Sequence, residues 1–386
     1  MPSAVIIDTA RTPIGRAYKG SLVDIRADDL AGLGIKALLE KVPGLDLATV
    51  DDVMMGCGLT HHEQGFNVGR IAALLGGLPD TVPGTTVNRF CASSLQTIRM
   101  AFHAITAGEG DTYIAAGVES VSRTYGKGFD SGDVNPRFAD ESRADFINQV
   151  YIPMGMTAEN VAERYGVTRE RMDEFAKRSQ DLAVEAQKNG FFEREITPVV
   201  LPDGRSAGVD DGPRPNTTIE KLASLEPVFR PGGSVTAGNS CPLNDGAAAV
   251  LVMEESRAIS LGLTPRARIV ASAVSGLAPE VMGVGPVEAV RKVLAHTGMS
   301  LSDIDVIELN EAFAAQVLAV VDMLGIDLER LNPHGGAIAL GHPFGMTGAR
   351  IMTTLLNDLE TLDLSLGLET MCVGGGQGMA MIIERI

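Results

Sequence analysis

The chain has 386 residues, of which 45% are hydrophobic and 21% are charged. This length allows two domains, or one large domain with an insertion, and a substantial core without metals or disulfides. The formal charge of −17 argues against a broad nucleic-acid-binding surface. A small anionic ligand held in a local basic pocket is still compatible with it.

No stretch is apolar for long enough to cross a membrane, and the first residues lack the pattern of a secretory signal. The four cysteines lie far apart and show no C-x-x-C spacing, which argues against a zinc ribbon or a thioredoxin motif: Cys57, Cys91, Cys241 and Cys372. We therefore expect free thiols, a cytoplasmic protein, and neither a membrane partner nor a bound metal.

The first third of the chain alternates short apolar runs with segments of helical periodicity. The pattern predicts strands at 5–7, 53–55, 85–87 and 112–116, and helices at 28–41, 68–75 and 91–107. Such alternation predicts a mostly parallel sheet with helices on both faces.

Residues 120–246 lack this regular alternation and are interpreted as a segment inserted beside the core. Residues 130–143 are polar and predict a surface loop, and residues 198–230 are irregular. Thr157 is predicted to begin one helix through a weak capping box, and residues 168–188 form a longer amphipathic helix.

The last third returns to alternation. It predicts strands at 267–273, 304–309, 368–372 and 378–384, and helices at 286–296, 312–324 and 347–356. This order resembles that of the first third, which indicates an internal duplication of one α/β unit.

Cys91 follows a predicted strand and begins a predicted helix. The positive end of a helix dipole lowers a thiol pKa and favours the thiolate, so Cys91 is a candidate nucleophile. A buried core cysteine is an equally good interpretation of this position alone. His342 stands between Gly341 and Pro343, a constrained turn in which a neutral imidazole can serve as the base for a cysteine. A solvent-exposed turn histidine is the alternative.

Cys372 opens a glycine-rich run at residues 374–378, where the backbone can approach a ligand closely. A second thiol can act as an acid and base, although a core cysteine that closes a strand fits this block as well. Asn310 follows the predicted strand at 304–309 and is either a helix cap or a group that holds a water or polarises a carbonyl.

Four segments together resemble the signature blocks of the thiolase family, in the same order and at similar spacing. They are Asn88-Arg89-Phe90-Cys91, Asn310-Glu311-Ala312-Phe313, Gly341-His342-Pro343 and Cys372-Val373-Gly374-Gly375-Gly376. The resemblance covers essentially the whole chain.

This resemblance implies a five-layered α/β/α/β/α fold of two similar core halves with an inserted loop domain. The halves would comprise residues 1–119 with 247–265, and residues 266–386, with the loop domain at 120–246. The resemblance also implies a homo-oligomer, a dimer or a tetramer, with acyl-CoA and CoA as substrates and no permanently bound cofactor.

The same resemblance implies a role for each reactive residue. Cys91 would carry the acyl group as a thioester, and His342 would activate it. Cys372 would exchange a proton with the α-carbon of acetyl-CoA, while Asn310 would hold a water that stabilises the enolate. The backbone N–H groups of Cys91 and Gly374 would form a second oxyanion hole.

The segment Val235–Gly246 resembles the loop that binds the pantetheine arm of CoA in this family, with Ala237, Gly238 and Cys241 as contacts. Arg214 and Lys221 would approach the nucleotide, although solvated surface charge is their alternative interpretation. The residues expected to line the pocket are Met154, Phe229, Met282 and Phe313. Three residues depart from the common family pattern, namely Pro153, Cys241 and His334.

The sequence thus predicts an acyltransferase that cleaves 3-ketoacyl-CoA, as in fatty acid breakdown, or condenses two acetyl-CoA molecules. The alternatives are a ketoacyl synthase-like condensing enzyme and a catalytically silent homologue that binds CoA or lipid. A papain-like cysteine hydrolase fits poorly because the second cysteine would have no role.

Overall fold

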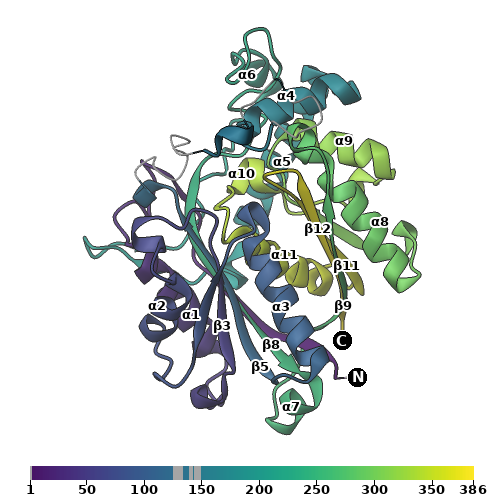
Figure 1. The fold of residues 1–386 in the computed structure, drawn as a ribbon. Helices are drawn as coiled ribbons and strands as arrows, with labels where there is room; N and C mark the ends of the chain where they lie inside the picture. The colour runs from purple at the N-terminus through teal and green to yellow at the C-terminus, as the bar shows by residue number, and fades with distance from the viewer. Residues whose placement is uncertain (1, 125–133, 139–141, 143–148) are drawn as a thin grey trace.

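The computed structural model describes residues 2–124, 134–138, 142 and 149–386. Its central feature is a sheet that falls into two halves (Figure 1). The strands of the first half are β1 (Ala4–Arg11), β2 (Gly15–Arg16), β3 (Asp52–Gly56), β4 (Gly84–Val87), β5 (Thr112–Ser120) and β8 (Asn244–Glu254). Those of the second half are β9 (Ala267–Gly276), β10 (Val306–Leu309), β11 (Leu366–Val373) and β12 (Gln377–Arg385).

The strand order is β10-β11-β12-β9-β1-β8-β5-β3-β4, and β2 pairs with β8. The two halves meet through a short antiparallel contact of β1 with β9, in which Val5 pairs with Arg268 and Ile6 pairs with Ala267.

The prediction of a mostly parallel sheet is wrong. Only β3 with β4, β3 with β5, and β10 with β11 run parallel among the strands described above. The strand β8 enters after the long insertion and runs antiparallel to both β1 and β5. The strands β11 and β12 are joined by the tight turn at 374–376, which forces antiparallel pairing.

Helices cover both outer faces and fill the space between the two half-sheets. The outer helices of the first half are α1 (Ala27–Lys41) and α2 (Val68–Leu75), and those of the second are α8 (Gly285–Thr297) and α9 (Ala314–Leu324). The helices α3 (Ser93–Ala107) and α11 (Thr347–Thr361) pack against each other between the sheets (Figure 1). The predicted five-layered arrangement is therefore confirmed.

Each of the three helix–sheet regions has its own apolar cluster. Leu95, Ile351 and Met371 belong to the central cluster. One further cluster lies beneath the outer helices of the first half, and another lies beneath those of the second. Burial of these side chains stabilises the layers by ~1.5–3 kcal/mol for each large apolar residue.

The inserted segment carries helices that lie at one end of the layers, in the upper part of Figure 1. Its elements are α4 (Met154–Tyr165), α5 (Arg169–Lys188), β6 (Val199–Val200), β7 (Ser206–Ala207) and α6 (Ile219–Ala223). Two further short helices, α7 (Glu255–Ser260) and α10 (Ala337–Leu340), belong to the core halves. Most of the predicted loop at 130–143 lies outside the described residues. The predicted domain boundaries stay a prediction.

The two predicted helix starts in this segment have different outcomes. Thr168 caps α5, and its hydroxyl accepts a hydrogen bond from Arg171 N at 3.4 Å. The predicted start at Thr157 is wrong because α4 begins at Met154. The Thr157 side chain does not cap the helix. Its hydroxyl lies within the first turn and donates to Met154 O at 2.6 Å.

Candidate active site

Cys91 lies in a short turn of 3₁₀-helix, Phe90–Ala92, that joins the end of β4 to the start of α3. Asn88 shapes this turn, because its Oδ1 accepts from Phe90 N at 2.8 Å while its Nδ2 donates to Gly58 O at 2.9 Å. Phe90 has a φ of +43°, which is costly for an aromatic residue. The turn therefore holds Cys91 in a constrained position at the base of α3.

The expectation that the helix terminus lowers the Cys91 pKa is wrong. Burial raises the pKa of this thiol to about 11, and the hydrogen bond from the Gly374 backbone N–H lowers it by less. The Cys91 side chain is 7% exposed, so desolvation of the thiolate outweighs the nearby N–H groups. Cys91 is a protonated thiol at neutral pH and needs a base to become a nucleophile.

His342 supplies a neutral imidazole with a defined tautomer. Its Nδ1 lies 2.6 Å from the hydroxyl of Thr347, which itself donates to Pro343 O. The hydroxyl must therefore accept from Nδ1–H, which leaves Nε2 as the unprotonated nitrogen that can accept a proton. Burial, and secondly the charge of Arg350, lower the His342 pKa to about 3.

Contacts to its backbone atoms hold the loop that carries His342. Asn244 Oδ1 accepts from His342 N at 2.9 Å. The loop lies directly on β5, since a Cβ at Gly117 would lie 2.0 Å from Gly345 O. Sequence reasoning missed Asn244 and Thr347. The spacing of Thr347, five residues after the histidine on a predicted helix, was the only local signal for either of them.

Asn310 is not a helix cap. The capping position of α9 is Phe313, and Asn310 N continues the strand ladder of β10 by donating to Thr370 O at 3.1 Å. The side-chain Nδ2 lies 3.3 Å from His342 Nε2. Asn310 Oδ1 is buried without a hydrogen-bond partner in the part of the chain that the structure describes. This oxygen is therefore able to accept from a water or a substrate group.

Cys372 lies near the end of β11, fully buried, in an apolar cluster with Met154, Met282 and Phe313. Burial, and then the neighbouring thiols of Cys91 and Cys241, raise its pKa well above the ordinary value. The structure thus brings the predicted pocket-lining residues around the second thiol. Phe229 joins them through an edge-to-face contact with Phe313, with ring centroids 6.1 Å apart.

The structure brings the five predicted catalytic residues into two groups of contacts, although the sequence separates them widely. Asn310 touches His342, Gly374 N–H touches Cys91, and the Cys91 and Cys372 thiols lie within electrostatic reach of each other. The two core halves each supply part of the site, because Cys91 comes from the first and the other groups come from the second.

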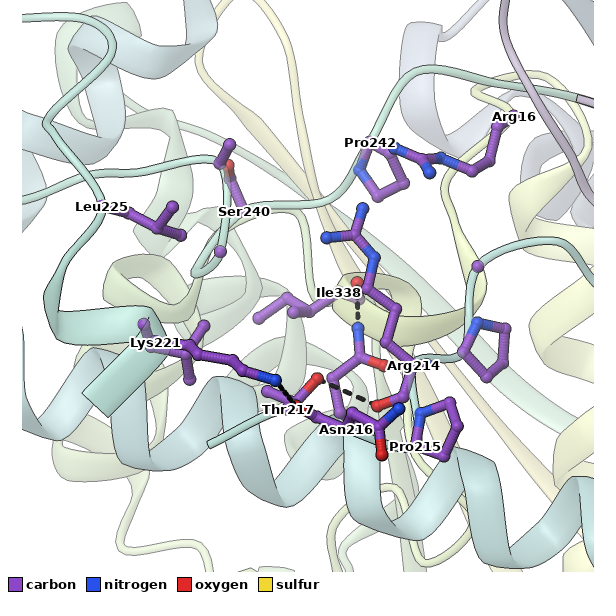
Figure 2. A pocket seen from close by; sticks show the side chains of 16 residues that line it. Arg16, Arg214, Pro215, Asn216, Thr217, Lys221, Leu225, Ser240, Pro242 and Ile338 are labelled. Carbon is purple, nitrogen blue, oxygen red and sulfur yellow. Dashed lines mark hydrogen bonds between the residues drawn. The ribbon is translucent and has the colours of Figure 1, made fainter. Parts of the chain in front are cut away.

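A cavity of about 440 Å³ lies beside the inserted segment (Figure 2). The residues expected to bind CoA that line it are Arg214, Lys221, Ala237 and Gly238. Cys241 is not among the lining residues, but its neighbours Ser240 and Pro242 are. Cys241 N donates to Ala312 O at 3.0 Å, which ties this loop to the segment that contains Asn310.

Arg16 also lines this cavity, and sequence reasoning missed it. Figure 2 shows its guanidinium and that of Arg214 approaching the same region beside Pro242. Burial, and then the charge of Arg16, lower the Arg214 pKa. Two guanidiniums that repel each other favour an anion between them, so the cavity is locally basic in an acidic chain.

Glu119 is a further residue that the sequence did not indicate, and it holds loops around the site. It lies at the end of β5, is fully buried, and accepts from Gly58 N at 2.9 Å, Leu59 N at 3.2 Å and Gln64 Nε2 at 2.7 Å. It also accepts from Gly345 N at 3.0 Å, in the loop that carries His342. Burial raises the Glu119 pKa to about 7 despite these donors.

We expect Glu119→Gln to make the stability difference from the wild type depend on pH. The folded-state pKa of Glu119 is raised, so its stabilising contribution is present below the unfolded pKa of about 4.5 and is lost as pH rises through about 7. Glutamine does not titrate. The variant is destabilised because its amide faces N–H donors. Its free energy of unfolding should nevertheless rise by up to ~3 kcal/mol relative to that of the wild type between pH 4.5 and 8.

Urea denaturation of both proteins at pH 5 and pH 8 measures this difference in the free energy of unfolding. Glu329→Gln, at an exposed position, is the matched control and should show no such trend. A difference between wild type and Glu119→Gln that is the same at both pH values would refute the assignment.

The described residues contain no group of three or more His, Cys, Asp or Glu side chains that could hold a metal ion. Among the helices in these same ranges, none combines the length and the apolar character needed to span a bilayer.

Comparison with known proteins identifies the family. The model of the N-terminal thiolase domain matches residues 4–256, and that of the C-terminal thiolase domain matches residues 263–385. The beta-ketoadipyl-CoA thiolase of Pseudomonas aeruginosa is 48% identical over 99% of this chain and 98% of its own. The 3-oxoadipyl-CoA/3-oxo-5,6-dehydrosuberyl-CoA thiolase of Escherichia coli is 47% identical over all of both chains.

The fold agrees with these matches. The dimeric peroxisomal thiolase of Saccharomyces cerevisiae superposes with a TM-score of 0.93 at 39% identity, covering 100% of this chain and 98% of that one. Domain models that span nearly the whole chain, full-length relatives and a shared fold all agree. The chain belongs to the thiolase family and is an acyltransferase.

Proposed function

We propose that this chain cleaves a 3-ketoacyl-CoA with CoA through a thioester on Cys91. The observations that support the proposal are a neutral His342 in contact with Asn310, and two buried thiols within electrostatic reach of each other, with the Gly374 N–H donating to Cys91. All three groups are uncharged at neutral pH. The site therefore needs no buried charge before the substrate arrives.

In the first half-reaction, the Cys91 sulfur attacks the C3 carbonyl while His342 Nε2 takes the thiol proton. The negative charge moves to the carbonyl oxygen, which the N–H groups of Cys91 and Gly374 stabilise. The bond between C2 and C3 then breaks. Its electron pair forms the enolate of acetyl-CoA, and the enolate oxygen faces His342 and a water held by Asn310.

Cys372 gives its proton to C2 of the enolate, and acetyl-CoA leaves. In the second half-reaction, the CoA thiol gives its proton to the Cys372 thiolate and its sulfur attacks the acyl–Cys91 thioester. The Cys91 thiolate that is released takes back the proton held by His342. Because every acyl bond is a thioester, the free energy of the acyl group is retained and the reaction can run in reverse as a condensation. Apolar walls of Met154, Met282 and Phe313 exclude water, which would otherwise hydrolyse the intermediate.

Cys372 supports this chemistry over that of a ketoacyl synthase-like enzyme, in which decarboxylation generates the enolate and no second thiol is needed. The chain also retains all four reactive residues, Cys91, Asn310, His342 and Cys372, which argues against a catalytically silent homologue. Homo-oligomerisation, as a dimer or a tetramer, stays a prediction. Two features support it: β4 ends the sheet with one edge unpaired in the described chain, and the nearby Phe66 is 94% exposed.

The substrate that we propose is a 3-ketoacyl-CoA with a terminal carboxylate, such as 3-oxoadipyl-CoA, in place of a fatty acyl chain. The names of the P. aeruginosa and E. coli relatives, at 48% and 47% identity over full length, support this choice. Cleavage of 3-oxoadipyl-CoA would leave a succinyl group on Cys91, whose free carboxylate lies three bonds from the thioester carbon.

Thiolysis of 3-oxoadipyl-CoA and 3-oxohexanoyl-CoA tests this proposal, because both acyl chains have six carbons and only the first ends in a carboxylate. We expect kcat/KM to favour 3-oxoadipyl-CoA by about 10- to 100-fold, the effect of one charge-assisted hydrogen bond. Equal values, or a preference for the uncharged chain, would refute the dicarboxylate assignment. Condensation of acetyl-CoA measured in parallel gives the preferred direction.

A further inference from the structure

The oxyanion hole proposed for Cys91 is assembled from the two halves of the chain. One of its N–H groups belongs to Cys91, at the start of α3, and the other belongs to Gly374, in the turn between β11 and β12. Stabilisation of an oxyanion requires each donor to lie within ~2.7–3.1 Å of the developing charge. Some contact must therefore hold the Gly374 turn in register with the Cys91 turn.

A pair of side chains makes this connection. Arg89, two residues before the nucleophile, donates from Nη1 to Gln377 Oε1 at 2.9 Å, although the two residues lie 288 positions apart. The amide of Gln377 in turn donates from Nε2 to Gly374 O at 3.2 Å. Two hydrogen bonds therefore connect the turn that contains the nucleophile with Gly374.

The opposite side of the same turn is fixed by the backbone. Leu277 N donates to Gly376 O at 2.8 Å, and a Cβ at Gly376 would lie only 2.2 Å from Leu277 O. Gly376 also has a φ of +82°, a region that glycine adopts without strain. The backbone contact therefore sets the far end of the turn, while Gln377 reaches the Gly374 end.

The α-carbon of Gly374 faces apolar groups. A Cβ placed on it would lie 3.5 Å from the Phe90 ring and 3.6 Å from Met154 Sδ, which are ordinary van der Waals distances. Apolar packing of this kind is non-directional and does not orient a peptide N–H. The β11–β12 ladder, in which Val373 pairs with Gln377, sets the backbone before Gly374, and the hydrogen bond from Gln377 Nε2 to the Gly374 carbonyl sets the backbone after it.

We propose that Arg89 and Gln377 are positioning residues that hold the Gly374 N–H against the oxygen of the Cys91 thioester. This inference rests on the thioester mechanism proposed above. Arg89 orients the Gln377 amide, and Gln377 holds the Gly374 carbonyl, which fixes the backbone on the far side of the Gly374 α-carbon from its N–H. Arg89 Nε is buried without a partner in the described ranges, so the Nη1 contact is the directed hydrogen bond of this guanidinium.

Three variants separate the steps of this path. Arg89→Met removes the donor to Gln377 and keeps most of the aliphatic stem. Gln377→Glu keeps an acceptor for Arg89 but has no N–H for the Gly374 carbonyl. Arg89→Lys retains a donor and should restore part of the lost rate. Arg99→Met is the matched control, because Arg99 also bonds across the halves, to Ser272 Oγ at 3.2 Å, but not to this turn.

We expect Arg89→Met and Gln377→Glu each to lower kcat about tenfold, less than the ~100- to 1,000-fold loss for removal of an oxyanion donor. The KM for CoA should change less than twofold. The double variant should be no slower than either single variant, because both break one path. Peptide mass spectrometry can follow the alkylation of Cys91 across pH. The midpoint pH of alkylation should rise in both variants, because the Gly374 N–H lowers the pKa of the thiol.

Four outcomes would overturn the inference. They are an unchanged kcat in both variants, an unchanged alkylation profile, an equal loss in Arg99→Met, and a rise in KM confined to substrates with a terminal carboxylate. In the last case, Arg89 would instead bind the terminal carboxylate of the substrate. Failure of the wild-type enzyme to form a Cys91 thioester would instead refute the proposed function.

Discussion

Replacement of Cys91 with alanine is expected to abolish thiolysis and to remove the acyl-enzyme. The loss in kcat should be at least ~10⁴-fold, as for other enzymes that lose a covalent nucleophile. The residual hydrogen bonds and the CoA cavity cannot compensate, because His342 then has no thiol to deprotonate. Binding of CoA should persist, since the cavity that contains Arg16 and Arg214 is formed by other residues.

Intact-protein mass spectrometry after addition of acyl-CoA measures this directly. The wild type should gain the mass of one acyl group, which peptide mapping should place at Cys91. Cys91→Ala should gain none, and its thermal unfolding should match the wild type within a few degrees. An acyl label at Cys241 or Cys372 in the wild type would contradict the assignment of the nucleophile.

Cys372→Ala is expected to separate the two halves of the reaction. Acyl transfer from acetyl-CoA to Cys91 needs the nucleophile, the base and the oxyanion hole, and so should continue. Formation of the carbon–carbon bond also needs a proton to leave C2 of the second acetyl-CoA. We expect this step to fall by ~10²- to 10⁴-fold, the range for loss of a general acid or base.

Acetylation of Cys91 by labelled acetyl-CoA and condensation to acetoacetyl-CoA measure the two half-reactions separately. Cys57→Ala is the matched control, because Cys57 is also a fully buried thiol but contacts Glu119, 3.9 Å away, outside the reacting groups. This control should keep both half-reactions within a few-fold of the wild type. If Cys372→Ala loses acetylation and condensation equally, Cys372 is not a separate proton carrier.

Local sequence patterns predicted most of the elements correctly. The helix at 68–75 agrees with α2 residue for residue, and the helix predicted at 168–188 agrees with α5 except that Thr168 is its cap. These features depend on residues within a few positions of one another, such as a glycine after the last turn or a hydroxyl before the first. The capping box at Thr157 failed because Pro153 already starts α4.

One departure from the family pattern acquired a physical explanation only from the fold. The ring of His334 stacks on Phe191 with centroids 3.6 Å apart, and its Nδ1 lies 2.6 Å from Asp358 Oδ1. Phe191 and Asp358 lie on either side of it in the sequence, more than one element away. No local pattern could have paired them.

The amino-acid sequence by itself determined the family of the chain, because the family motifs consist of consecutive residues such as those around Cys91 and His342. The tertiary structure alone decided their ionisation: burial overrides the helix terminus at Cys91 and keeps His342 neutral. It also decided the mixed strand directions and the contact of Arg89 with Gln377. Desolvation and long-range pairing depend on the whole packed chain, and no short stretch of sequence records them.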